Sequence, residues 1–214
     1  MFKIIHATEA AQHAGIMASM HRLRHRVFKQ RMGWDVPSEG EVERDQFDID
    51  DTIYLVSVND RTGEVDGTFR LLPTTGPNML RDVFPQLMGD LPIPANPFIW
   101  EMSRLCIDYK EGSLRTKERG GCTMGHLFAC AMEYGWAHGI RELVVVHDRR
   151  MAKLTQRLLG FTPTWESEPM EMSGIETTAA QYRIVNPTEF RARVGLDAPL
   201  LSEEDLGARR SSVA

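Results

Sequence analysis

The hydrophobic residues of this chain follow two spacings, one typical of strands and the other of helices. Apolar residues that alternate with polar ones, or that form short continuous runs, predict strands at residues 2–6, 54–58, 65–72, 98–107, 142–147 and 181–186. Apolar residues three and four positions apart predict a helix that begins near residue 10, and further helices at 79–88, 127–136, 149–159 and 187–194. This order of elements predicts an α/β fold, with three layers (α/β/α) and a mixed central sheet.

The length and composition are those of one globular domain. The chain has 214 residues, of which 42% are hydrophobic and 26% are charged, so it can bury one sizeable core. Residues 1–201 contain the periodic segments and are predicted to form a single domain. Residues 202–214 are mostly polar and are predicted to form a flexible tail.

Cysteine content, hydropathy and charge predict a cytoplasmic protein that binds neither membranes nor nucleic acids. The cysteines (Cys106, Cys122 and Cys130) are odd in number and lack a Cys-x-x-Cys spacing, which indicates neither a disulfide framework nor a zinc site. His21 and His25 lie four residues apart, but without the glutamate of a zinc-binding helix they predict no metal site. No segment resembles a signal peptide, and no apolar run approaches the ~20 residues that span a bilayer. A net charge of -5 argues against general nucleic-acid binding.

The predicted strand 98–107 carries three polar residues, Glu101, Ser103 and Arg104, among aromatic and β-branched ones. Alternation along a strand sends Glu101 and Ser103 to one face and Arg104 to the other. Buried polar groups need partners, so one interpretation is an internal ion pair between Glu101 and an arginine. The other is a general base in a cleft. These residues alone favour the ion pair.

A polar segment from Gly33 to Asp51 predicts a long loop, and its aromatic residues Trp34 and Phe47 indicate that the loop docks onto a surface or a ligand. Its aspartates, Asp45 and Asp48 among them, lack the spacing of a calcium-binding loop. They are expected to bind a cationic ligand or an internal arginine. Arg70, among apolar residues of the strand 65–72, needs a carboxylate partner, which Glu101 or Asp48 would provide.

Two segments carry basic residues that fit an anionic partner. The helix 149–159 carries Arg149, Arg150, Lys153 and Arg157, which as a group are usually a solvated face. The segment Gly120–Gly125 follows a basic stretch and opens the helix 127–136, so it predicts either a phosphate cradle or a flexible loop with a glycine-rich helix start.

Taken together, these positions resemble the acyl-homoserine-lactone synthases of the LuxI type, from the first helix to about Gly160. The resemblance implies the fold of the GCN5-related N-acyltransferases. The residues that carry it are Arg24, Phe28, Trp34, Asp45, Asp48, Arg70, Phe84 and the run Glu101-Met102-Ser103-Arg104.

The resemblance implies that the amino group of S-adenosylmethionine (SAM) is joined to an acyl group held as a thioester on acyl carrier protein or CoA. The lactone then closes, with release of methylthioadenosine. SAM is a substrate here, and no cofactor is implied. Glu101 would be the general base, with Ser103 and Arg104 positioning the substrates. The substrate-binding positions would be Arg24, Phe28, Trp34, Asp45, Asp48, Arg70, Phe84 and Val145.

Two expectations concern the acyl donor. Acyl carrier proteins are acidic, so the basic helix would be their docking site, through Arg149, Arg150, Lys153 and Arg157. Val145 stands near the position where relatives that prefer 3-oxo chains often carry threonine, which implies an unsubstituted or otherwise modified chain.

Two alternatives remain open from the sequence. An N-acetyltransferase that uses acetyl-CoA is favoured if Trp34 and the aspartate segment do not form a SAM site, and product analysis separates the two activities. An acyltransferase-like binding module without catalysis would show ligand binding without turnover.

Overall fold

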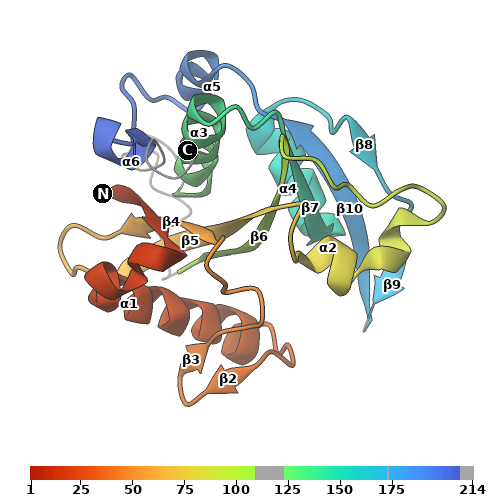
Figure 1. The fold of residues 1–214 in the computed structure, drawn as a ribbon, viewed down its shortest axis with the longest axis horizontal. Helices are drawn as coiled ribbons and strands as arrows, with labels where there is room; N and C mark the ends of the chain where they lie inside the picture. The colour runs from red at the N-terminus through yellow and green to blue at the C-terminus, as the bar shows by residue number, and fades with distance from the viewer. Residues whose placement is uncertain (109–122, 173, 208–214) are drawn as a thin grey trace.

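A mixed β-sheet forms the middle layer of the molecule, and helices cover both of its faces (Figure 1). The computed structural model describes residues 1–108, 123–172 and 174–207. Helix α1 covers one face of the sheet, while α3 and α4 cover the other. The predicted α/β/α arrangement is therefore confirmed.

The strands follow the spatial order β1-β4-β5-β6-β7-β10-β8, with β9 also paired to β10. Neighbouring strands are antiparallel except for β6 and β7, which are parallel and make the sheet mixed. The strands of this sheet are β1 (Phe2–His6), β4 (Ile53–Val58), β5 (Val65–Pro73), β6 (Ile99–Ile107), β7 (Glu142–Asp148), β8 (Trp165–Glu166), β9 (Met170–Met172) and β10 (Ile175–Arg183).

The predicted first helix consists of three consecutive segments of different geometry, η1, α1 and η2. The last of these is a π-helix, a form that often marks functional positions. The helical segments are η1 (Ala7–His13), α1 (Ala14–Arg24), η2 (His25–Arg31), α2 (Met79–Asp82), η3 (Pro85–Met88), α3 (Thr123–Ala137), α4 (Arg149–Leu159), α5 (Pro187–Arg193) and α6 (Glu203–Gly207).

Strand β4 is buried on both faces and joins the two main cores. Leu55 belongs to the core under α3, and the next residue, Val56, belongs to the core under α1. This alternation follows from the pleat of the strand. On the α1 side, Met20 and Leu23 fill the contact and are fully buried. The continuous apolar run of β4 therefore reflects its place between two helical layers.

The parallel strands β6 and β7 separate along their length. Their ladder pairs Ile99–Met102 with Glu142–Val145 and extends no further. The rest of β6 remains paired with β5, and the rest of β7 with β10. The separation leaves space between the two halves of the sheet beyond Met102.

The structure differs from the sequence prediction in two helical or loop regions. The predicted long loop between Gly33 and Asp51 contains a small hairpin of β2 (Ser38–Glu39) and β3 (Val42–Glu43). The predicted helix at 79–88 is divided into α2 and η3, because Pro85 has no N–H with which to continue the first segment. Val83, an apolar residue between the two segments, is exposed.

The last strand lies earlier in the sequence than the predicted range 181–186. Strand β10 begins at Ile175, in a run of threonine and alanine with little apolar mass, and ends at Arg183. It ends there because Asn186 caps α5, with its side chain accepting hydrogen bonds from the N–H groups of Thr188 and Glu189.

The end of the described chain is fixed to the core by a buried carboxylate. Glu133 on α3 accepts hydrogen bonds from the N–H groups of Leu200 and Leu201 and from Arg191. The segment predicted to be a flexible tail begins with α6, in which Asp205 accepts a hydrogen bond from Ile4 N–H. Residues 208–214 lie outside the described residues. No helix in the described ranges is both long enough and apolar enough to cross a membrane.

Candidate active site

A cavity of about 890 Å³ lies where β6 and β7 separate. It extends from Trp34, after η2, past Glu101 on β6 to Val145 on β7 and Met151 on α4. The predicted site residues that line it are Phe28, Trp34, Asp45, Phe84, Glu101, Ser103, Arg104 and Val145. One space thus joins the amino-terminal segments to the apolar core beneath α4.

Glu101 holds α2 against the central strand. Its two carboxylate oxygens accept hydrogen bonds from the N–H groups of Met79 (3.1 Å) and Leu80 (2.7 Å). Burial raises the pKa of Glu101 above its usual value, although the N–H groups of Leu80 and Met79 act in the opposite direction. The carboxylate is only 1% exposed but lines the cavity, which is the environment of a base with a raised pKa.

The prediction that Arg104 faces away from Glu101 and Ser103 is wrong. The register with β5 shifts between Thr68 and Arg70, which places a β-bulge at Arg104 and Leu105 of β6, opposite Phe69. Among the described residues, Arg104 is the one residue other than glycine with a positive φ, at 55°. The bulge interrupts the alternation and turns the guanidinium toward the cavity that Ser103 also lines.

Three arginines and three carboxylates form one buried group beside the cavity, which we call the ionic cluster. Asp48 accepts hydrogen bonds from Arg24 Nη1 (2.7 Å) and from the Tyr54 hydroxyl (2.9 Å). Asp45 accepts hydrogen bonds from Arg70 Nη1 (2.5 Å) and pairs with Arg104 Nη2 (2.6 Å). The members of the ionic cluster are Arg24, Arg70, Arg104, Glu43, Asp45 and Asp48.

The opposite charges in the ionic cluster determine its protonation. Burial by itself would raise the pKa of Asp48, but Arg24 and Arg70 outweigh it and hold that pKa well below the usual range. The pKa of Asp45 is also lowered, because Arg70 and Arg104 outweigh its burial. The aspartates are therefore charged near neutral pH. Arg24 and Arg70 are almost fully buried and do not line the cavity, so they position Asp45 and Arg104, which do.

Aromatic rings close the amino-terminal end of the cavity. Phe28 and Trp34 stack with ring centroids 5.3 Å apart and an interplanar angle of 12°. The guanidinium of Arg104 lies 5.4 Å from the Phe28 ring centroid. An apolar wall next to a fixed arginine and the Asp45 carboxylate suits a ligand with both flat and charged parts.

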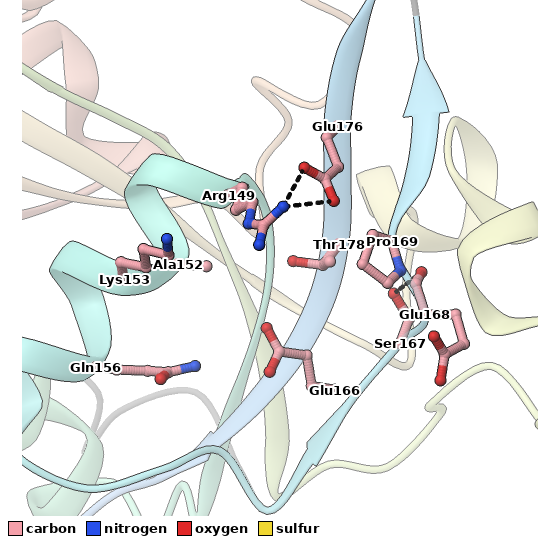
Figure 2. A pocket seen from close by; sticks show the side chains of 10 residues that line it. All are labelled: Arg149, Ala152, Lys153, Gln156, Glu166, Ser167, Glu168, Pro169, Glu176 and Thr178. Atoms are coloured by element: carbon pink, nitrogen blue, oxygen red, sulfur yellow. Dashed lines mark hydrogen bonds and ion pairs between the residues drawn. The ribbon is translucent and has the colours of Figure 1, made fainter.

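The basic residues of α4 lie outside the cavity, and Figure 2 shows two of them beside a second groove. Arg149 donates hydrogen bonds to Glu176 on β10 at 3.1 and 3.3 Å. Lys153 lines the same groove of about 450 Å³, which also contains Glu166 and Glu168. Arg150 and Arg157 are exposed and do not line this groove. Two of the four basic residues of α4 therefore line a groove that also carries acidic side chains, and the other two lie away from it.

Sequence reasoning missed two residues that the fold brings to the site. Glu43 is fully buried and pairs with Arg24 and Arg104, but in the sequence it stands among polar residues that gave no sign of burial. His147 follows the apolar run of β7 and lines the cavity. The predicted phosphate cradle is Gly120–Gly125, and its first three residues lie outside the described residues. The basic residues before it also lie outside them.

The sequence matches one family of known proteins, both by family model and by individual relatives. Residues 8–181 match the family model described as autoinducer synthase. An acyl-homoserine-lactone synthase of Ralstonia nicotianae is 37% identical over 144 residues, which cover 66% of this chain and 69% of that protein. The acyl-homoserine-lactone synthase of Acinetobacter nosocomialis is 31% identical over 162 residues, which cover 75% of this chain and 87% of that protein.

Solved structures give the same result. BjaI, a CoA-dependent acyl-homoserine lactone synthase with SAM and isopentyl-CoA, superposes with a TM-score of 0.78 at 27% identity, covering 93% of this chain and 91% of that one. The acyl-homoserine-lactone synthase LasI superposes with a TM-score of 0.72 at 27% identity, covering 92% and 95%. An N-acetyltransferase from Lactobacillus plantarum, at 18% identity and a TM-score of 0.53, shares the fold alone.

The ionic cluster predicts an acid-sensitive stability. Asp48→Asn should lower the free energy of unfolding near neutral pH by about 3 kcal/mol, because it leaves buried arginine charge without its partner. The pKa of Asp48 is lowered in the folded state, so its contribution is complete above the unfolded pKa of about 4 and is lost as pH falls below it. Urea denaturation between about pH 7 and about pH 3 measures both effects.

The variant should therefore lose less stability on acidification than the wild type. Asp50→Asn, which removes an exposed carboxylate from the same segment, is the matched control and should leave stability nearly unchanged. Equal unfolding free energies for the two variants would show that the Asp48 pairs contribute nothing.

Proposed function

This chain belongs to the acyl-homoserine-lactone synthase family, and from that premise we propose that it makes its lactone from SAM and an acyl thioester, with acyl carrier protein as the preferred carrier. It is an acyltransferase. The amino group of SAM, after losing a proton, attacks the thioester carbonyl; the C–S bond breaks, the thiol of the carrier leaves and an amide forms. The SAM carboxylate oxygen then closes the lactone ring and expels methylthioadenosine as the leaving group.

The single observation that carries this proposal is the continuous cavity through the gap between β6 and β7. A two-substrate reaction needs both ligands to meet at one point with water excluded. The aromatic pair Phe28 and Trp34 stands at one end of the cavity, and the apolar residues Val145 and Met151 stand at the other. Glu101 lies on the strand between them. SAM would enter on the aromatic side and the acyl chain on the apolar side.

Glu101 is the general base in this proposal. The SAM ammonium must lose a proton before its nitrogen can attack, and a carboxylate of raised pKa accepts that proton, directly or through one water. Both Glu101 oxygens already accept backbone hydrogen bonds, which fix the carboxylate in place. A carboxylate has about four acceptor positions, so Glu101 can still accept a hydrogen bond from the substrate.

As the amine attacks, negative charge develops on the thioester carbonyl oxygen, and hydrogen-bond donors beside that oxygen are needed to stabilise it. Beyond Met102, the edge of β6 that faces β7 carries backbone N–H groups that no longer belong to the β7 ladder. These groups would stabilise the oxyanion. Ser103 and Arg104 position the substrates, since Ser103 is itself held by Arg70 Nε at 3.2 Å and Arg104 by the ionic cluster.

SAM carries a sulfonium, an ammonium and a flat adenine, and the amino-terminal end of the cavity offers a counterpart to each kind of group. Phe28 and Trp34 give aromatic faces to a cation or a base. Asp45 supplies the nearby carboxylate, held by Arg70 and Arg104. Arg24 and Asp48 support this arrangement from the buried side, and Phe84 adds an apolar wall near α2.

One experiment tests the proposed function. Purified protein is incubated with SAM and mixed acyl thioesters, on acyl carrier protein and on CoA, and the product is identified by mass spectrometry. The expected products are an acyl-homoserine lactone and methylthioadenosine, with the carrier-bound donor used more efficiently. Transfer of an acetyl group to another amine, without lactone, would favour the N-acetyltransferase alternative.

Glu101→Gln should lower turnover by about 100-fold or more, because the amide cannot accept the proton. The amide also replaces one acceptor oxygen with a donor next to Leu80 or Met79 N–H, which costs about 1–3 kcal/mol of stability. The wild-type rate should rise with pH through the raised pKa of Glu101, and this dependence should disappear in the variant. Rates measured across pH at saturating substrates check this.

Asn78→Ala is the matched control, since the Asn78 side chain caps α2 by accepting a hydrogen bond from Arg81 N–H. It loosens α2 without changing the carboxylate, and should keep the wild-type pH dependence. Near-normal turnover in Glu101→Gln would remove Glu101 from the role of base.

Trp34→Ala should raise the KM for SAM by about tenfold while the protein stays folded, because the ring is only partly buried and stacks on one neighbour, Phe28. Steady-state kinetics with SAM as the varied substrate, together with a thermal melt, separates the two effects. Trp136→Ala is the control: this tryptophan is 56% exposed on α3 and does not line the cavity. If Trp34→Ala unfolds the protein but leaves SAM binding normal in the folded fraction, Trp34 is a core residue only.

Arg150→Glu combined with Lys153→Glu should raise the KM for the carrier-bound donor about tenfold at low salt, and less at high salt, because steering of an acidic carrier weakens with screening. SAM binding should not change. Kinetics with both donors at several salt concentrations measure this. Arg61→Glu combined with Arg183→Glu makes the same change in net charge at other exposed positions. Unchanged kinetics with carrier-bound and CoA-bound donors would place docking elsewhere.

A further inference from the structure

His147 places a polar atom in the apolar part of the cavity. It stands on β7 two residues after Val145, so the pleat directs both side chains to the same face, and both line the cavity. Its Nε2 atom is buried and has no hydrogen-bond partner among the described residues. The Tyr182 ring meets it edge to face, at 6.3 Å between centroids and an interplanar angle of 80°.

The fold gives no structural reason for a histidine at this position. Leu143 and Val145, which precede it on the same face of β7, belong to the apolar core, and a valine at 147 would continue that run. A buried polar atom without a partner costs stability, and natural proteins keep very few of them. Burial lowers the pKa of His147 to about 4, although Asp148 acts in the opposite direction. The ring is therefore neutral near neutral pH.

The neighbours of His147 define what can satisfy it. Leu143, Val145, Met151 and Leu159 line this part of the cavity with apolar groups, while Thr155 and Tyr182 add two hydroxyl-bearing side chains. A ligand that fills the space must be largely hydrocarbon, with one hydrogen-bonding group where it passes the imidazole. A neutral imidazole can donate to a carbonyl oxygen or accept from a hydroxyl, depending on its tautomer. A fully saturated, unsubstituted chain would leave Nε2 without a partner.

We propose that His147 selects an acyl chain that carries a hydroxyl or carbonyl oxygen, with which it forms one hydrogen bond. This inference rests on the proposed function, in which the acyl chain occupies the apolar end of the cavity. Val145 offers no hydrogen bond to the chain. On the same face of β7, the next side chain that offers one is His147, two residues further along.

The test uses full-length protein, SAM and acyl thioesters of one chain length that carry no oxygen, a hydroxyl or a keto group at successive carbons. The quantity measured is kcat/KM for each donor. The best oxygenated donor should exceed the unsubstituted one by roughly 3- to 10-fold, the range expected for one hydrogen bond. His147→Val should abolish this preference by lowering the rate with the oxygenated donor and sparing the unsubstituted one. His147→Gln keeps a hydrogen-bonding group and should retain part of the preference.

His25→Val is the matched control, because His25 is also buried with an unpartnered ring nitrogen in the described structure but does not line the cavity. It should keep the wild-type preference, and a thermal melt monitors folding of every variant. Equal kcat/KM for oxygenated and unsubstituted donors, or an unchanged preference in His147→Val, would overturn the inference and leave the proposed function intact. No lactone with any donor would overturn the proposed function and this inference with it.

Discussion

The buried ionic cluster is the interaction on which the rest of the site depends. It joins segments that are far apart in the sequence: α1, the segment after β2, and the strands β5 and β6. Burying any one of these charges alone would destabilise the folded state. The three arginines and three carboxylates balance each other, so the burial of each depends on the others. The amino-terminal segments are therefore held against the central strand at a fixed distance, and this sets the width of one end of the cavity.

Only part of the ionic cluster faces the cavity. Asp45 and Arg104 line it, whereas Arg24 and Arg70 are buried behind them. The buried members hold Asp45 and Arg104 in position, and they keep Asp45 charged, so a ligand meets groups that need no rearrangement. Such preorganisation is what makes electrostatic contacts effective in a site that excludes water. The left-handed conformation of Arg104 is compatible with this, since strained residues gather where the surroundings hold them in place.

The separation of β6 from β7 provides the other half of the site. Paired strands have no room for a ligand between them, and the end of the ladder at Met102 both opens the sheet and frees backbone donors on its edge. Glu101 lies just before this point, fixed by α2. Sheet geometry thus brings a base, backbone donors and an apolar channel together, and the chemistry of acyl transfer needs these three.

Periodicity and residue type are local properties, and they were enough to predict the layers, most of the elements and the family. The sequence also identified the polar residues of β6, and it offered Glu101 or Asp48 as the partner of Arg70, which the structure pairs with Asp48 and Asp45. The face of Arg104, the burial of Glu43 and the unpartnered nitrogen of His147 were decided only by the tertiary structure. A bulge depends on the register between two strands, and burial depends on segments distant in sequence, so neither has a signal in the residues alone.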